Sequence, residues 1–121
     1  MRSLLALVTL VLTAPALACS QNGCGTTGRA LWPPPPYDKF DGSAQIQIAN
    51  DMEEMGMWCA PHPLRFKLRA CSFRVARPGQ PVWCQVYIAP PSYLARSGDT
   101  VDDLIRHELG HCAGWPADHP R

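Results

Sequence analysis

Residues 107–119 read HELGHCAGWPADH, and this stretch decides how the C-terminal part of the chain should fold. An α-helix advances 3.6 residues per turn, so His107 and His111 would lie one above the other on one helix face. Two imidazole nitrogens could then bind one metal ion, while Glu108 could reach a water molecule on that ion without binding the ion itself. The pattern therefore predicts a metal site on the last helix.

The residues around this motif predict a helix of about thirteen residues that ends just after it. Asp99 and Thr100 are residue types that favour the N-cap, and two aspartates follow in the first turn. Gly114 favours a helix stop, and Pro116 cannot continue a helix. The apolar positions recur at spacings of three and four, at Val101, Leu104, Ile105, Leu109 and Cys112. One helix face should therefore pack against the core.

The motif resembles the H-E-x-x-H helix of the zincin metallopeptidases. The resemblance covers this helix and the turn after it, about a tenth of the chain. It implies a zinc-dependent metallopeptidase that hydrolyses a peptide or protein substrate. His107 and His111 would be the zinc ligands and Glu108 the general base.

The third metal ligand is expected in the tail after Gly114. In the metzincin branch, a His or Asp follows that glycine by three residues, but Ala117 occupies this position here. We expect His119 to be the third ligand, because neutral imidazole commonly accompanies two other histidines on zinc. Asp118 is the alternative third ligand, or it could orient a ligand imidazole. No methionine follows the motif, so the methionine turn of metzincins is absent and a compact zincin is the better comparison.

The first eighteen residues have the features of a secretory signal peptide. A positive start precedes an apolar run that is too short to span a bilayer, and Ala16 to Ala18 form an A-x-A cleavage site. We therefore expect one exported domain over residues 19–121, periplasmic or extracellular, with no transmembrane span. Lipoprotein processing at Cys19 is an alternative that the residues before it disfavour.

Six cysteines follow the predicted cleavage site, and this even number permits three disulfides in an oxidising compartment. No C-x-x-C pair is present, so bridging is favoured over metal binding by thiolates. The six candidates are Cys19, Cys24, Cys59, Cys71, Cys84 and Cys112. Six cysteines allow fifteen pairings, and the sequence does not choose among them.

Charge gives no sign of a nucleic-acid partner. Eleven Lys and Arg residues, one of which is Arg2 in the predicted signal peptide, stand against ten Asp and Glu residues. A nucleic-acid-binding domain usually has a basic excess. We therefore expect no nucleic-acid partner.

The middle of the chain predicts one more helix and two strands. Residues 19–42 are rich in Pro and Gly and should form an extended strap, with polyproline II at Pro33 to Pro36. Ser43 to Met57 is a predicted helix with Ser43 as its N-cap. Leu64 to Ala76 alternates in the manner of a half-buried strand, with a bulge expected near Cys71-Ser72.

Val82 to Ile88 also alternates, and it should pair with the preceding strand as an antiparallel hairpin. The basic residues of the first strand, Arg65, Lys67 and Arg69, should form a solvated face. The predicted fold is α+β: a small disulfide-stapled single domain with a β-hairpin or small antiparallel sheet packed against two helices. The metal site would lie on the C-terminal helix.

A strand, a Pro-Pro loop and then the metal helix follow one another in the order found in zincins. In that family the strand edge along the cleft pairs with an extended substrate. Tyr87 and Tyr93 are candidate donors to the developing oxyanion. The alternative is a non-catalytic exported interaction module, either zinc-binding or stabilised by disulfides alone.

Overall fold

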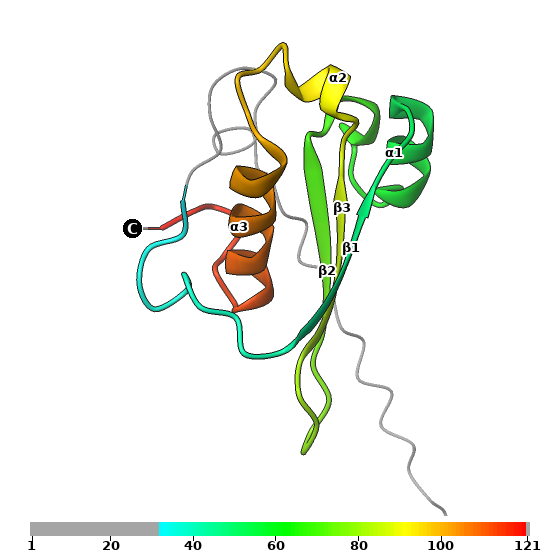
Figure 1. Cartoon of the computed structure of the whole chain (residues 1–121). Coiled ribbons are helices and arrows are strands. Elements are labelled where there is room, and N and C mark those ends of the chain that lie inside the picture. Colours follow the sequence, from blue (N-terminus) through cyan, green and yellow to red (C-terminus); the bar gives the residue numbers. More distant parts are fainter. Residues whose placement is uncertain (1–31, 121) are drawn as a thin grey trace, which may run out of the picture.

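A three-stranded sheet lies between helices in the computed structural model, which describes residues 32–120 (Figure 1). The strands are β1 (Ser43–Ile48), β2 (Ala70–Val75) and β3 (Trp83–Ile88), in the order β1-β3-β2. The helices are α1 (Met52–Trp58), the 3-10 helix η1 (Arg65–Lys67), α2 (Pro91–Leu94) and α3 (Val101–Cys112). The predicted small α+β domain is confirmed.

The two faces of the sheet carry different helices (Figure 1). Side chains alternate along a strand, so Cys84, Val86 and Ile88 of β3 share one face. Cys84 is bridged to Cys112, which places α3 on this face. Tyr87 points to the other face, where its ring lies 4.9 Å from the ring of Trp58 in α1.

The predicted hairpin is present, but the sheet is mixed. β2 pairs with β3 in an antiparallel ladder that runs unbroken from Ala70↔Ile88 to Val75↔Trp83. The bulge expected near Cys71-Ser72 is therefore absent. β1 adds to the other side of β3 in parallel, from Ser43↔Trp83 to Ile48↔Ile88.

The predicted helix over Ser43 to Met57 is wrong in its first half. Residues 43–48 form β1, where Ile46 and Ile48 alternate with glutamines in the period-two pattern of a strand. The helix is only α1, and Asp51 rather than Ser43 is its N-cap, accepting a hydrogen bond of 2.8 Å from the Glu54 N–H. The apolar residues of 43–57 recur at helical spacing, but residues 43–48 gain more from backbone pairing with β3 than from forming a helix.

The strand predicted to begin at Leu64 begins at Ala70, because residues 65–67 form η1. Arg69 does not belong to a solvated basic face: it is 1 % exposed and forms a buried ion pair with Asp99. A buried charge without a partner is strongly destabilising. This ion pair therefore holds the start of β2 against the segment before α3.

Two disulfides lie among the described residues. Cys59–Cys71 joins the end of α1 to β2, and Cys84–Cys112 joins β3 to the end of α3. All four cysteines are buried and belong to the hydrophobic core, together with Met55, Val86 and other apolar side chains. Two disulfides are typical of an oxidising, exported environment. The predicted signal peptide, Cys19 and Cys24 lie outside the described residues.

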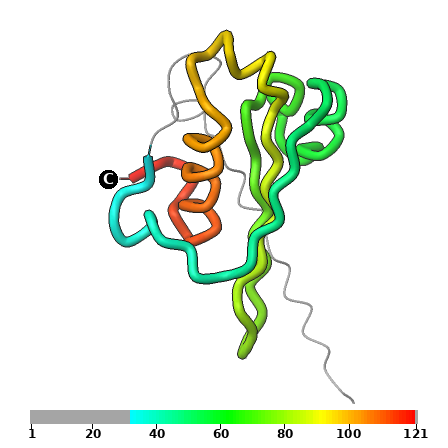
Figure 2. The backbone as a smooth tube through the Cα atoms, viewed as in Figure 1, coloured from blue at the N-terminus to red at the C-terminus, as the bar shows by residue number. Residues whose placement is uncertain are grey.

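The N-terminal strap, residues 32–42, runs along the side of α3 away from the sheet (Figure 2). The Trp32 ring lies 4.1 Å from the Arg106 guanidinium, and Arg106 also forms an ion pair with Asp38. The four prolines do not form a continuous polyproline II segment. The Tyr37 N–H donates to the Pro34 carbonyl at 2.8 Å, which closes a turn. None of the described helices is long and apolar enough to cross a membrane.

Candidate metal centre

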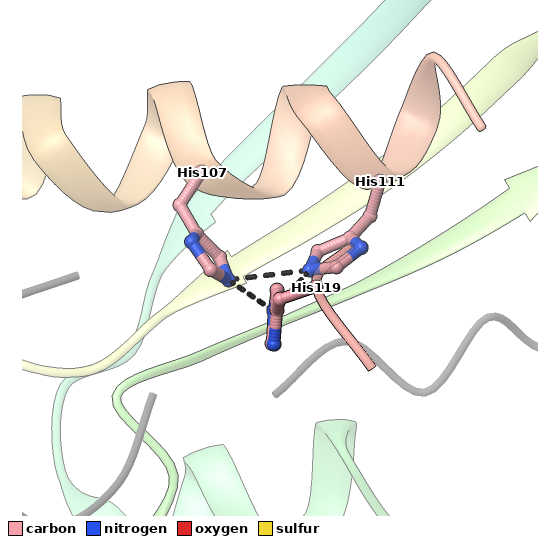
Figure 3. A group of neighbouring side chains, drawn as sticks. All are labelled: His107, His111 and His119. Carbon is pink, nitrogen blue, oxygen red and sulfur yellow. Dashed lines mark hydrogen bonds between the residues drawn. The ribbon is translucent and has the colours of Figure 1, made fainter. Parts of the chain in front are cut away.

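Three buried histidines meet beside α3 (Figure 3). His107 and His111 project from successive turns of α3, and His119 comes from the tail that folds back beneath them. The Nε2 atom of His111 lies 3.2 Å from that of His107 and 3.1 Å from that of His119, and the third Nε2 pair is 3.3 Å apart. The structure therefore brings together the three residues proposed as ligands.

These distances suit a tetrahedral metal ion. Two nitrogens that each lie 2.0–2.1 Å from a tetrahedral zinc ion are about 3.3–3.4 Å apart. The observed separations of 3.1–3.3 Å are close to this value. A neutral imidazole has one N–H, so three nitrogens of one triangle cannot all be satisfied by hydrogen bonds to one another. The cluster could hold a metal ion.

A backbone carbonyl decides which nitrogen of His111 can be a metal ligand. Its Nδ1 atom lies 2.7 Å from the carbonyl oxygen of Trp115, which can only accept, so Nδ1 carries the proton and donates. Burial lowers the pKa of His111 to about 4, against the opposing effect of this backbone carbonyl. Burial also lowers the pKa of His119, with Asp118 opposing the shift. Neutral rings are the form that binds metal.

The tail reaches the site because α3 ends in a Schellman turn. The Gly114 N–H donates to the His111 carbonyl at 2.9 Å, and the Trp115 N–H donates to the Gly110 carbonyl at 3.0 Å. Gly114 has a φ of 101°, which favours glycine. A second turn follows, in which the His119 N–H donates to the Pro116 carbonyl at 3.0 Å.

These two turns accommodate the two extra residues of the tail. They bring His119, rather than the residue three positions after the glycine, to the helix face. Asp118 is exposed and does not belong to the group of converging ligand atoms. The structure therefore gives no support to the alternative of Asp118 as the third ligand.

Trp115 packs against all three imidazoles, although its sequence position alone did not predict a role in the site. Its ring stacks on His111 with a centroid distance of 5.1 Å and an interplanar angle of 15°. It meets His107 and His119 at steep angles, with centroids 5.3 and 4.7 Å away. Its indole N–H donates to the Pro120 carbonyl at 2.9 Å. An aromatic residue directly after a helix-stopping glycine was the available signal, since this position folds back on the helix.

Glu108 lies on the sheet side of α3. Its carboxylate accepts a hydrogen bond of 2.7 Å from the Ser72 hydroxyl on β2, and both residues are buried. Burial raises the pKa of Glu108 to about 8, although the bond from Ser72 opposes this shift. Glu108 is not among the converging ligand atoms. The alternation of residues in β2 could have predicted that Ser72 lies on the face towards α3. It could not have predicted that Ser72 lies opposite Glu108.

The two candidate oxyanion donors lie elsewhere. Tyr87 points to the sheet face opposite α3, where its ring packs against Trp58 and Phe73, so it does not face the helix that carries the histidines. The Tyr93 hydroxyl donates to the Lys67 carbonyl at 3.1 Å. Both tyrosines were predicted to lie near the helix because they come shortly before it in the sequence. The direction of Tyr87 is instead set by the alternation of side chains along β3, and that of Tyr93 by its hydrogen bond to Lys67.

Comparison with known proteins gave no match. No protein-family model matches the chain. No curated protein and no solved structure matches it either. We therefore infer the function from the residues of the site.

Proposed function

We propose that this protein is an exported zinc-dependent metallopeptidase of the zincin type. The observation that carries the proposal is the triangle of His107, His111 and His119 nitrogens, with a buried carboxylate on the residue directly after the first histidine. Three neutral imidazoles are a donor set that zinc favours, and three protein ligands are typical of a catalytic zinc site. The signal-peptide features of residues 1–18 and the two disulfides support export.

Zinc, when bound, supplies a Lewis acid for a substrate carbonyl and lowers the pKa of water towards about 7. Glu108 is the proposed general base: its carboxylate takes a proton from the attacking water and delivers it to the leaving amine. Ser72 holds one carboxylate oxygen of Glu108 in a fixed position through its hydroxyl. A neighbouring dication would favour the charged carboxylate against the effect of burial.

The proposed substrate is an extended peptide beside β2. This strand is at the edge of the described sheet, and its Ser72 contacts the helix that carries the site. A substrate segment could add to the outer edge of β2 through main-chain hydrogen bonds, with side-chain pockets giving selectivity. β2 would then lead the scissile bond past the imidazoles of α3.

A second candidate function is a non-catalytic zinc-binding exported module. Burial favours it, because His107 and Glu108 are both 0 % exposed. Structural zinc sites are closed, whereas catalytic sites keep one position open for water and substrate. In this case zinc would stabilise the tail on α3, and Glu108 would have no role in hydrolysis.

The test compares Glu108→Gln with the wild-type protein, both purified with their disulfides formed. We expect both proteins to bind one zinc ion, measured by elemental analysis. Only the wild type should cleave a peptide library, and a chelator should stop the cleavage. The loss in Glu108→Gln should be at least about 10²-fold, because general-base catalysis contributes roughly 10²–10⁴-fold.

The matched control is Glu53→Gln, which changes an exposed carboxylate on α1 and should leave cleavage unchanged. Turnover that survives in Glu108→Gln would remove Glu108 from the mechanism. A wild-type protein that binds zinc but cleaves nothing would favour the non-catalytic module.

A further inference from the structure

We infer that Trp115 is the positioning residue of the metal centre, because it holds the three imidazoles in their triangle through a separate contact to each part of the site. This inference rests on the metal-binding part of the proposed function and not on the hydrolysis. Trp115 is 2 % exposed and directly follows the glycine that ends α3.

The first contact sets the tautomer of His111. The carbonyl of Trp115 accepts from the Nδ1–H of His111 at 2.7 Å, which leaves the Nε2 lone pair for a metal ion. The indole ring stacks on the same imidazole, so the plane of His111 is fixed as well as its proton. Position 115 therefore acts on this ligand twice: the backbone carbonyl holds the proton of His111, and the indole ring holds its plane.

The second contact holds the tail. His119 has a φ of 54°, a left-handed conformation that residues other than glycine seldom adopt. Such a conformation persists where the surrounding structure enforces it. The indole N–H of Trp115 donates to the carbonyl of Pro120, the residue directly after His119, at 2.9 Å. This bond fixes the chain at the point where His119 must turn towards α3.

The third contact links a ligand on the helix to the ligand on the tail. The Trp115 ring meets His107 and His119 at interplanar angles of 67° and 68°, with ring centroids 5.3 Å from His107 and 4.7 Å from His119. One ring therefore packs against a histidine of α3 and against the histidine of the tail. Without an aromatic ring here, His119 would lose the surface against which it packs.

The experiment compares Trp115→Phe with Trp83→Phe. Phenylalanine at position 115 keeps the backbone carbonyl and a smaller ring but removes the indole N–H that holds the tail. Trp83 is 43 % exposed on β3 and serves as the matched control. Zinc affinity is measured by competition with a chromogenic chelator, and the ligand geometry is followed by the visible spectrum of the Co²⁺-loaded protein. Trp115→Phe should bind zinc about 10–100-fold more weakly, as is typical when a group that orients a ligand is lost, and should alter the Co²⁺ spectrum. Trp83→Phe should match the wild type in both.

Each outcome decides a separate point. Wild-type affinity and spectrum in Trp115→Phe would overturn the inference while leaving the metal centre intact. The same holds if this variant only lowers the melting temperature of the metal-free protein. A wild-type protein that binds no zinc would instead refute the proposed function.

A second measurement needs no substitution and therefore does not depend on the folding of a variant. Co²⁺ added to the wild-type protein should quench the share of the emission that comes from Trp115, one of four tryptophans, with the same midpoint as the visible absorption. This is expected because Trp115 contacts all three ligands. Emission that stays unchanged while Co²⁺ binds would overturn the inference.

Discussion

Replacing Gly110 by alanine should destabilise this protein, although the same change stabilises most helices. Alanine is about 1 kcal/mol more favourable than glycine inside a helix. At Gly110, however, a new Cβ atom would lie 2.6 Å from Cβ of Pro33 and 3.2 Å from Cε3 of Trp115. Overpacking of this kind typically costs about 1–3 kcal/mol.

The upper part of that range applies because the Pro33 ring is rigid and must move together with the strap. Movement of the strap would also weaken the stacking of Trp32 on Arg106, an exposed cation–π contact of about 0.5–1 kcal/mol. After the helix-propensity gain is subtracted, Gly110→Ala should lower the free energy of unfolding by about 1–2 kcal/mol.

The assay is urea unfolding of the metal-free protein, followed by circular dichroism. Combining Gly110→Ala with Pro33→Gly should recover part of the loss, with a coupling energy of about 1 kcal/mol, because the second change removes the obstructing ring. If Gly110→Ala alone were stabilising by about 1 kcal/mol and showed no coupling, the strap would not be seated on α3.

Three further predictions concern the site and its supports. His119→Ala should weaken zinc affinity by at least about tenfold, whereas Asp118→Asn should leave it within about twofold, as measured by chelator competition. The folded-state pKa of Glu108, about 8, exceeds its ordinary 4.5, so the stability it contributes is lost as pH rises through the folded value. Between pH 6.5 and 8 the metal-free wild type should lose up to about 1.4 kcal/mol per pH unit in urea unfolding, and Glu108→Gln should remove this slope. Replacing Cys84 and Cys112 by alanine should cost about 3.6 kcal/mol from loop entropy, since 28 residues separate them. Calorimetry showing no fall in melting temperature would contradict that value.

The elements predicted best are those with local signals. The helix over Val101–Cys112 was predicted almost to the residue, because Thr100 caps it and Gly114 ends it. Two histidines four positions apart on such a helix must share a face, so the centre of the site was predictable from helix geometry alone.

The elements predicted poorly depend on distant partners. Residues 43–48 become a strand only because β3 offers a parallel partner forty positions later. Arg69 looked solvated from its alternation, but its burial depends on Asp99, thirty positions away. The placement of Ser72 opposite Glu108 likewise needs the packing of α3 on the sheet, which no local pattern contains.

The helix that carries two of the proposed ligands is anchored at both ends by groups other than imidazoles. Before its first turn, Asp99 is tied to Arg69, and at its last residue Cys112 is bridged to Cys84 and receives a hydrogen bond of 3.0 Å from Arg74. Zinc fingers, by contrast, unfold without their ion. Here a chelator should remove the proposed metal ion without unfolding the protein, so that the metal-free protein can be loaded with different divalent ions in turn.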